Sequence, residues 1–157
     1  MKIRLILHGK AARDPRVREA VGAVRADGHV VEVRVTWEAG DAGRFARDAV
    51  ADAHRGAIDC IVAGGGDGTV NEVFASALGA EPPESCTFGI LPLGTANDFA
   101  HSTNIPVDDL TAALRLVVEA PASRIDVGSL NGRVFVNLVS GGFGSRVTVE
   151  TDPDLKR

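Results

Sequence analysis

The chain has 157 residues, of which 45% are hydrophobic and 24% are charged, and its formal net charge is −4 at pH 7. This length and balance predict one globular domain with a substantial core. The acidic balance argues against a nucleic-acid partner and against membrane docking through a polybasic patch. No apolar run has the length of a signal peptide or a transmembrane helix. These features predict a cytoplasmic protein.

The chain contains two cysteines, Cys60 and Cys86, each in or just before an apolar strand candidate. A disulfide or a thiol nucleophile is one interpretation. We favour a pair of buried small hydrophobic residues in a reducing compartment. The sequence contains no Cys and His cluster with the spacing of a metal site.

Strands and helices are expected to alternate through most of the chain. Asp14 and Pro15 have the pattern of a helix N-cap followed by proline in the first turn, and Gly28 is placed to end that helix. The predicted strands cover residues 3–7, 30–36, 58–63 and 87–91, and the predicted helices cover residues 15–26, 41–55, 70–78, 97–102 and 110–119.

This alternation predicts right-handed β-α-β units and a Rossmann-like, three-layer α/β/α fold with a mostly parallel sheet. After Pro121 the pattern changes, because residues 124–130 and 133–139 are both β-rich. The Asn131-Gly132 pair between them is a strong hairpin signal. The hairpin marks either the edge of one domain or the entry to another.

Two glycine-rich turns, Gly64–Glu72 and Leu91–Phe99, each follow a predicted strand and precede a predicted helix. Glycines at such a junction let backbone N–H groups close on an anion, and the helix N-terminus adds positive potential. Two turns of this kind side by side would form one phosphate site. The sequence therefore predicts that the protein binds a nucleotide.

Asp67 is the informative residue of the first turn. A carboxylate beside phosphates is repulsive unless a divalent cation or a proton stands between them, so Asp67 indicates Mg²⁺ or a hydrogen-bonded network. The alternative is that Asp67 only caps the following helix. Thr69 and Thr95 would each offer a hydroxyl to a phosphate.

Further acidic and polar residues are expected at the same edge of the sheet. Asn97 and Asp98 follow the second turn, and capping of the next helix is the alternative for either one. Asp126 ends a β-rich run, where an ordinary turn residue is the alternative. Thr36 is placed to meet the base or ribose. For Trp37, the only tryptophan, a cover over the core is the alternative.

The sequence lacks the motifs of two common nucleotide-binding sites. No Gly-x-x-x-x-Gly-Lys-Ser/Thr segment occurs, so the chain has no P-loop. The first strand is followed by His8-Gly9-Lys10 rather than by Gly-x-Gly-x-x-Gly, which argues against a dinucleotide-dependent dehydrogenase.

The two turns together resemble the diacylglycerol kinase catalytic family, and within it the bacterial YegS-like lipid kinases. The glycine turn with Asp67 is also shared with NAD kinases and phosphofructokinases. The pairing of residues 65–72 with residues 92–99 is more specific. Residues 33–42 and 141–144 match the family as well, so the resemblance covers essentially the whole chain. One departure is His8, where relatives often carry asparagine.

The resemblance implies an ATP-dependent kinase that phosphorylates a lipid hydroxyl at the membrane surface, of the phosphatidylglycerol or diacylglycerol type. Asp67, Asp98 and Asp126 match acidic residues of a Mg²⁺–water network, in which Asp67 would meet the ATP-bound Mg²⁺ or another divalent ion such as Ca²⁺. The implied ATP contacts are Thr36, Gly66, Asp67, Gly68, Thr69, Val70, Asn71, Glu72 and Thr95.

Members of this family continue into a second, β-rich domain that carries the catalytic base and a structural metal site. The resemblance therefore predicts an ATP-binding α/β domain at residues 1–122 and the start of a truncated second domain at residues 123–157. We expect the base beyond Arg157 and little turnover from the chain by itself. An exposed edge of the strand at residues 134–139 could pair two copies.

Two other functions stay open at this point. One is a soluble-metabolite kinase of the NAD-kinase type, which Asn97-Asp98-Phe99 disfavours. The other is a non-catalytic nucleotide-binding module.

Overall fold

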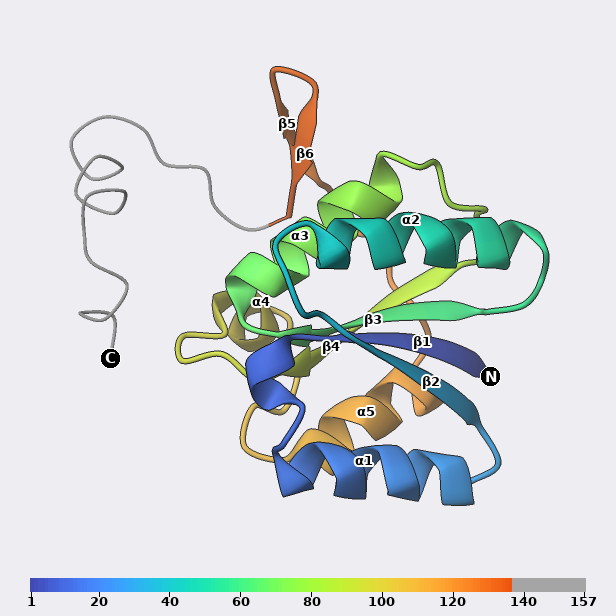
Figure 1. Cartoon of the computed structure of the whole chain (residues 1–157), viewed down its shortest axis with the longest axis vertical. Coiled ribbons are helices and arrows are strands. Elements are labelled where there is room, and N and C mark those ends of the chain that lie inside the picture. The colour runs from blue at the N-terminus through green and yellow to red at the C-terminus, as the bar shows by residue number, and fades with distance from the viewer. Residues whose placement is uncertain (137–157) are drawn as a thin grey trace.

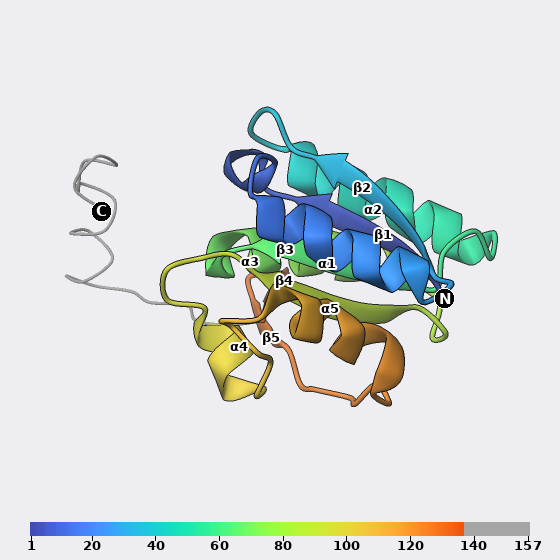
Figure 2. The same cartoon turned by 90° about the horizontal axis from the view of Figure 1, so that it is seen from below.

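The computed structural model describes residues 1–136, which fold into helices packed on both faces of a parallel sheet (Figures 1 and 2). The strands are β1 (Lys2–Leu7), β2 (Val30–Val35), β3 (Cys60–Gly65), β4 (Thr87–Pro92), β5 (Gly128–Leu130) and β6 (Arg133–Phe135). The helices are the 3₁₀ turn η1 (Gly9–Ala11), α1 (Pro15–Ala26), α2 (Asp41–His54), α3 (Asp67–Leu78), α4 (Asp98–Ser102) and α5 (Leu110–Glu119).

The main sheet has four parallel strands in the order β2-β1-β3-β4. Helices α2 and α3 cover one face, and α1 and α5 cover the other (Figure 1). The chain moves outward from β1 to β2 and then returns to the far side of β1, so the strand order reverses between β1 and β3. In open α/β sheets, ligands bind at the carboxyl ends of the strands at such a reversal.

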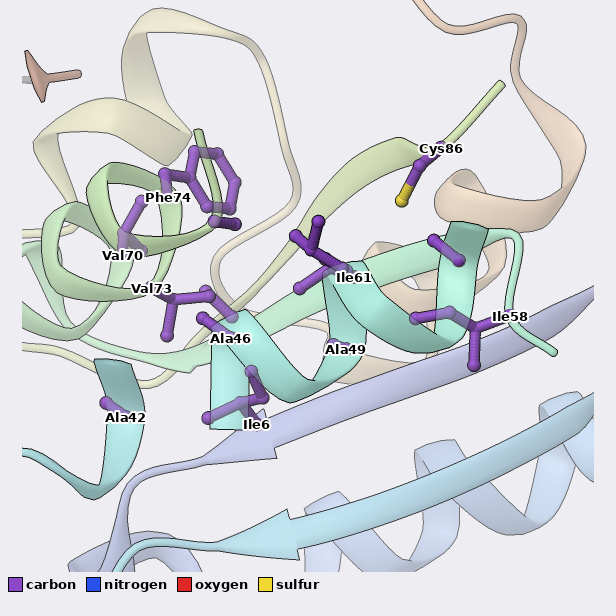
Figure 3. Close-up of a cluster of buried hydrophobic side chains, with 14 of the residues drawn as sticks. Ile6, Ala42, Ala46, Ala49, Ile58, Ile61, Val70, Val73, Phe74 and Cys86 are labelled. Carbon is purple, nitrogen blue, oxygen red and sulfur yellow. The ribbon is translucent and has the colours of Figure 1, made fainter. Parts of the chain in front are cut away.

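Two apolar clusters hold the three layers together. Figure 3 shows the cluster under α2 and α3, where Ile6 and Ile61 from the sheet meet Val73 and Phe74. The second cluster joins the other face of the sheet to α1 and α5. Strands β1 and β3 are buried along almost their whole length, as strands covered on both faces must be. The predicted three-layer fold is confirmed.

The first glycine turn is tighter than the sequence predicts. Strand β3 begins at Cys60 rather than Ile58 and continues through Gly65, and α3 begins at Asp67 rather than Val70. Only Gly66 separates the two elements. Gly64 stays in the sheet because its missing side chain leaves room for neighbours: a Cβ there would lie 3.0 Å from Cδ1 of both Leu5 and Leu7.

The predicted hairpin forms, but its first strand is shorter than predicted. Strand β5 pairs with β6 from Gly128 onward, and residues 124–127 are exposed and outside any strand. Asn131 and Gly132 have φ of 50° and 74°, and a two-residue turn of this type needs a positive φ at both central positions. Residues 137–139 of the second predicted strand, its proposed pairing edge and the segment 141–144 lie outside the described residues.

Both cysteines are buried and carry free thiols, as predicted. Burial raises the pKa of Cys60 to about 12 and that of Cys86 to about 11, so both remain protonated at neutral pH. None of the helices described within residues 1–136 has both the length and the apolar character needed to cross a bilayer.

Candidate functional site

The two glycine turns lie against each other at the carboxyl edge of the sheet, as the sequence predicts. The backbone N–H of Leu93 donates to the carbonyl oxygen of Gly65 at 2.9 Å. A Cβ on Gly94 would lie only 2.5 Å from Cα of Gly66, so the contact requires glycine at both positions. The strand pairing of β3 with β4 brings these turns together although 28 residues separate them in sequence.

Asp67 links the first turn to the helix that follows the second. Its Oδ2 accepts from the backbone N–H of Asp98 at 3.2 Å, and its Oδ1 accepts from that of Phe99 at 3.1 Å. The carboxylate therefore satisfies two backbone N–H groups at the start of α4, which have no partner within that helix. These two bonds fix the carboxylate between the two turns.

Asn97 closes the second turn on itself. Its Oδ1 accepts from the N–H of Gly94 at 2.8 Å, and its Nδ2 donates to the carbonyl oxygen of Gly94 at 2.9 Å. The residue is buried and has φ of 51°, a left-handed conformation that asparagine tolerates better than most residues. The side chain makes no capping bond to α4, so the capping alternative for Asn97 is wrong.

A cleft of about 710 Å³ opens beside the first turn. It is lined by the loop after β1, the loop after β2 and the first turns of α3, which contribute Thr69 and Glu72. Thr36 lies in its wall, where its Oγ1 accepts from the N–H of Gly9 at 3.1 Å. This volume falls in the usual range of small-molecule sites, about 300–1,000 Å³.

Several other predicted site residues do not have side chains in the lining of this cleft. Gly68, Thr95 and Asp126 are exposed and do not line this cleft. Val70 is buried in the core, so only its backbone faces the turn. Within residues 1–136, no group of three or more His, Cys, Asp and Glu side chains could hold a metal ion. A shared network of Asp67, Asp98 and Asp126 therefore stays a prediction.

Within the rim of the cleft at residues 36–40, the sequence predicts a site role for Thr36 alone. Trp37 lines the cleft and is 94% exposed, so the alternative that it covers the core is wrong. Asp41 fixes this loop, because its buried Oδ2 accepts from the N–H groups of Trp37 at 2.8 Å and Glu38 at 3.1 Å. These two bonds, followed by one from Arg44, lower the pKa of Asp41. The signal in the sequence was an aspartate that directly follows Gly40 at a helix start.

Asn71 holds the hairpin to α3. Its Oδ1 accepts from the backbone N–H of Val136 at 3.1 Å, and Val136 packs on the cluster under α3. We expect Asn71→Ala to lower the free energy of unfolding by about 1 kcal/mol, because it leaves that partly buried N–H without its acceptor. Urea denaturation measures the change. Asn71→Asp keeps an acceptor oxygen and is the matched control; equal losses in both variants would contradict this role.

The comparisons with known proteins agree with this geometry. The family model for the diacylglycerol kinase catalytic domain matches residues 2–130. A probable lipid kinase, YegS-like, from Chromohalobacter salexigens is 49% identical over 153 residues, which are 98% of this chain and 48% of that protein. Its counterpart from Cronobacter sakazakii is 47% identical over 97% of this chain and 50% of that protein.

A solved structure of a diacylglycerol kinase has a similar fold. The crystal structure of a diacylglycerol kinase from Bacillus anthracis str. Sterne superposes with a TM-score of 0.71 and 28% identity, over 85% of this chain and 47% of that one. The chain thus spans about half the length of the relatives it matches. With a family model that covers most of its residues and relatives identical at nearly half of the aligned positions, the chain belongs to the diacylglycerol kinase catalytic domain family.

Proposed function

We propose that this chain supplies the ATP-binding part of a lipid kinase that transfers the γ-phosphoryl group of ATP to a lipid hydroxyl, of the phosphatidylglycerol or diacylglycerol type. The observation that carries the proposal is the contact between Gly66 and Gly94 beside the cleft. It brings the two turns, with the hydroxyl-bearing residues Thr69 and Thr95, to one edge of the sheet. Membership of a kinase family supports ATP as the nucleotide.

The residues present fit Mg²⁺·ATP. Thr36, Thr69 and Glu72 line the cleft, and the glycine backbone permits close approach of phosphate oxygens. Asp67 is fixed beside the two turns by its bonds to the backbone of α4, and a carboxylate oxygen is a ligand type that Mg²⁺ accepts. When bound, Mg²⁺ neutralises charge on the phosphates. The contribution of the chain is to orient the phosphates and to hold Asp67 at a fixed position, since phosphoryl transfer depends mostly on positioning and electrostatics.

Removal of the charge of Asp67 tests the proposal. We expect Asp67→Asn to lower the affinity for ATP in Mg²⁺ by about tenfold, or about 1.4 kcal/mol, and to abolish the difference between Mg²⁺ and EDTA. Isothermal titration calorimetry measures both quantities, and circular dichroism checks that the fold is kept. Asp48→Asn, at an exposed position on α2, is the charge-matched control. Wild-type chain that binds ATP equally well in EDTA would refute the metal-dependent site.

The same titration separates the alternatives. A soluble-metabolite kinase of the NAD-kinase type should bind NAD as well as ATP, whereas a lipid kinase should not. A non-catalytic nucleotide-binding module should bind ATP without any requirement for Mg²⁺. Phosphorylation by radiolabelled ATP of phosphatidylglycerol and diacylglycerol vesicles then compares the lipid acceptors.

A further inference from the structure

The indole ring of Trp37 is exposed to solvent at the rim of the cleft. It is 94% exposed, yet it belongs to the lining of the cleft. Exposure of a large aromatic ring to water is unfavourable, and buried or ligand-covered rings are the usual arrangement. Val35, the last residue of β2 and two positions before Trp37, is 41% exposed and also lines the cleft.

The loop that carries the ring is fixed before any ligand arrives. Asp41 accepts from the N–H groups of Trp37 and Glu38, and Arg44 donates to the other oxygen of the same carboxylate. Gly40 has φ of 88°, a left-handed conformation that favours glycine and allows the tight turn into α2. The backbone at Trp37 is therefore held in place at the rim.

The two ends of the cleft differ in chemistry. The side formed by the end of β2 and the start of α2 carries the apolar side chains of Val35, Trp37, Ala39 and Ala42, with Thr36 and Glu38 among them. The side formed by α3 presents Thr69 and Glu72 and adjoins the glycine turns. A ligand with a flat apolar group at one end and phosphates at the other matches this gradient.

We propose that Trp37 stacks on the base of the nucleotide and that Asp41 positions it to do so. This inference rests on the proposed function, since it assigns the base end of the same site. Aromatic side chains can stack on any nucleotide base, because every base has a π-face. A membrane anchor is the other use of an exposed tryptophan. The exposed carboxylate of Glu38, next to the ring, disfavours insertion among anionic headgroups.

Trp37 is the only tryptophan in the chain, so its fluorescence reports directly on the proposed contact. We expect ATP with Mg²⁺ to quench the emission and inorganic tripolyphosphate, which has no base, to leave it unchanged. Trp37→Ala should weaken ATP binding about tenfold, whereas Trp37→Phe, which keeps an aromatic face, should stay within about threefold of wild type. Calorimetry supplies the affinities for all three chains.

The outcomes distinguish this inference from the proposed function. Equal ATP affinity of Trp37→Ala and wild type would overturn the stacking role and leave the ATP site intact. A blue shift of the Trp37 emission with phosphatidylglycerol vesicles, together with an emission that stays unchanged when ATP binds, would overturn the stacking role in favour of membrane contact. Absence of ATP binding to the wild-type chain would overturn the proposed function, and this inference with it.

The positioning role of Asp41 has its own readout. Asp41→Ala removes the acceptor for the N–H groups of Trp37 and Glu38, so we expect lower fluorescence anisotropy of Trp37 and a loss of ATP affinity smaller than that of Trp37→Ala. Asp41→Asn keeps one acceptor oxygen and should recover part of both. Unchanged anisotropy in Asp41→Ala would refute the role.

Discussion

Replacement of Gly94 by alanine is expected to destabilise the fold by about 2–3 kcal/mol, the upper part of the range for overpacking a close contact. The added Cβ would lie 2.5 Å from Cα of Gly66 and 2.8 Å from Oδ1 of Asn97. Gly66 is backbone in the facing turn, and Asn97 is fixed by two hydrogen bonds to Gly94 itself. Neither neighbour can move without opening the junction between the two turns.

The same substitution should reduce ATP binding, because the turns that hold the phosphates are forced apart. Urea denaturation measures the stability, and calorimetry in Mg²⁺ measures the affinity. The backbone of Gly94 is not in the left-handed region, so the close approach alone accounts for the expected loss.

Gly22→Ala is the matched control. Gly22 lies on the exposed face of α1, and a Cβ there would meet nothing within 4 Å. Alanine is the better helix former, so this variant should be more stable than wild type by about 0.5–1 kcal/mol. If Gly94→Ala were as stable as Gly22→Ala, the contact between the turns would not require glycine.

The elements that could be predicted from the sequence are those fixed by local pattern. The start of α1 follows from Asp14 and Pro15, whose N-cap geometry appears as expected. The buried strand β3 follows from an apolar run, and the hairpin turn follows from Asn131-Gly132. Each of these signals lies within a few residues of the structure it determines, which is why the fold class was accessible.

The parts of the site that could not be predicted depend on residues distant in sequence. For Asp67 the sequence predicts a metal ion, a hydrogen-bonded network or a helix cap, and it does not identify the backbone partners, which lie 31 and 32 positions further along. The sequence predicts that strand β3 ends at Ala63, where the apolar run stops and the glycine turn begins. Pairing with β4 keeps Gly64 and Gly65 in the sheet. The sequence leaves the position of Trp37 at the cleft open, because an apolar residue gives no local sign of whether it faces the core or a cleft.

A buried arginine provides the second large effect. Arg4 lies on β1 with 5% exposure, between Glu32 of β2, at 2.8 Å, and Asp52 of α2, at 2.7 Å. Its Nε is buried without a hydrogen-bond partner among the described residues. Because a buried charge that loses its partner is costly, Asp52→Ala should lower the free energy of unfolding by about 3 kcal/mol. We take the lower end of the usual range, since Glu32 still faces the guanidinium.

The pair should also give the stability a dependence on pH. The hydrogen bond from Arg4, with a smaller one from Arg55, lowers the pKa of Asp52 below its ordinary value in the folded chain. The stabilisation is therefore fully present above the unfolded pKa of about 3.9 and is lost as the pH falls through the lower, folded value. Chemical denaturation at a series of pH values between about 2 and 6 should show this loss in wild type and a weaker one in Asp52→Ala.

The decisive comparison uses Arg4→Met, which removes the charge but keeps much of the length of the side chain. Replacement of a buried ion pair by apolar packing is often neutral or stabilising, so we expect Arg4→Met to lie within about 1 kcal/mol of wild type. In that background, Asp52→Ala should cost much less than it does beside Arg4, because no buried charge is left unpaired. Equal costs of Asp52→Ala in the two backgrounds would show that Asp52 stabilises α2 through Arg55 and not through the buried guanidinium.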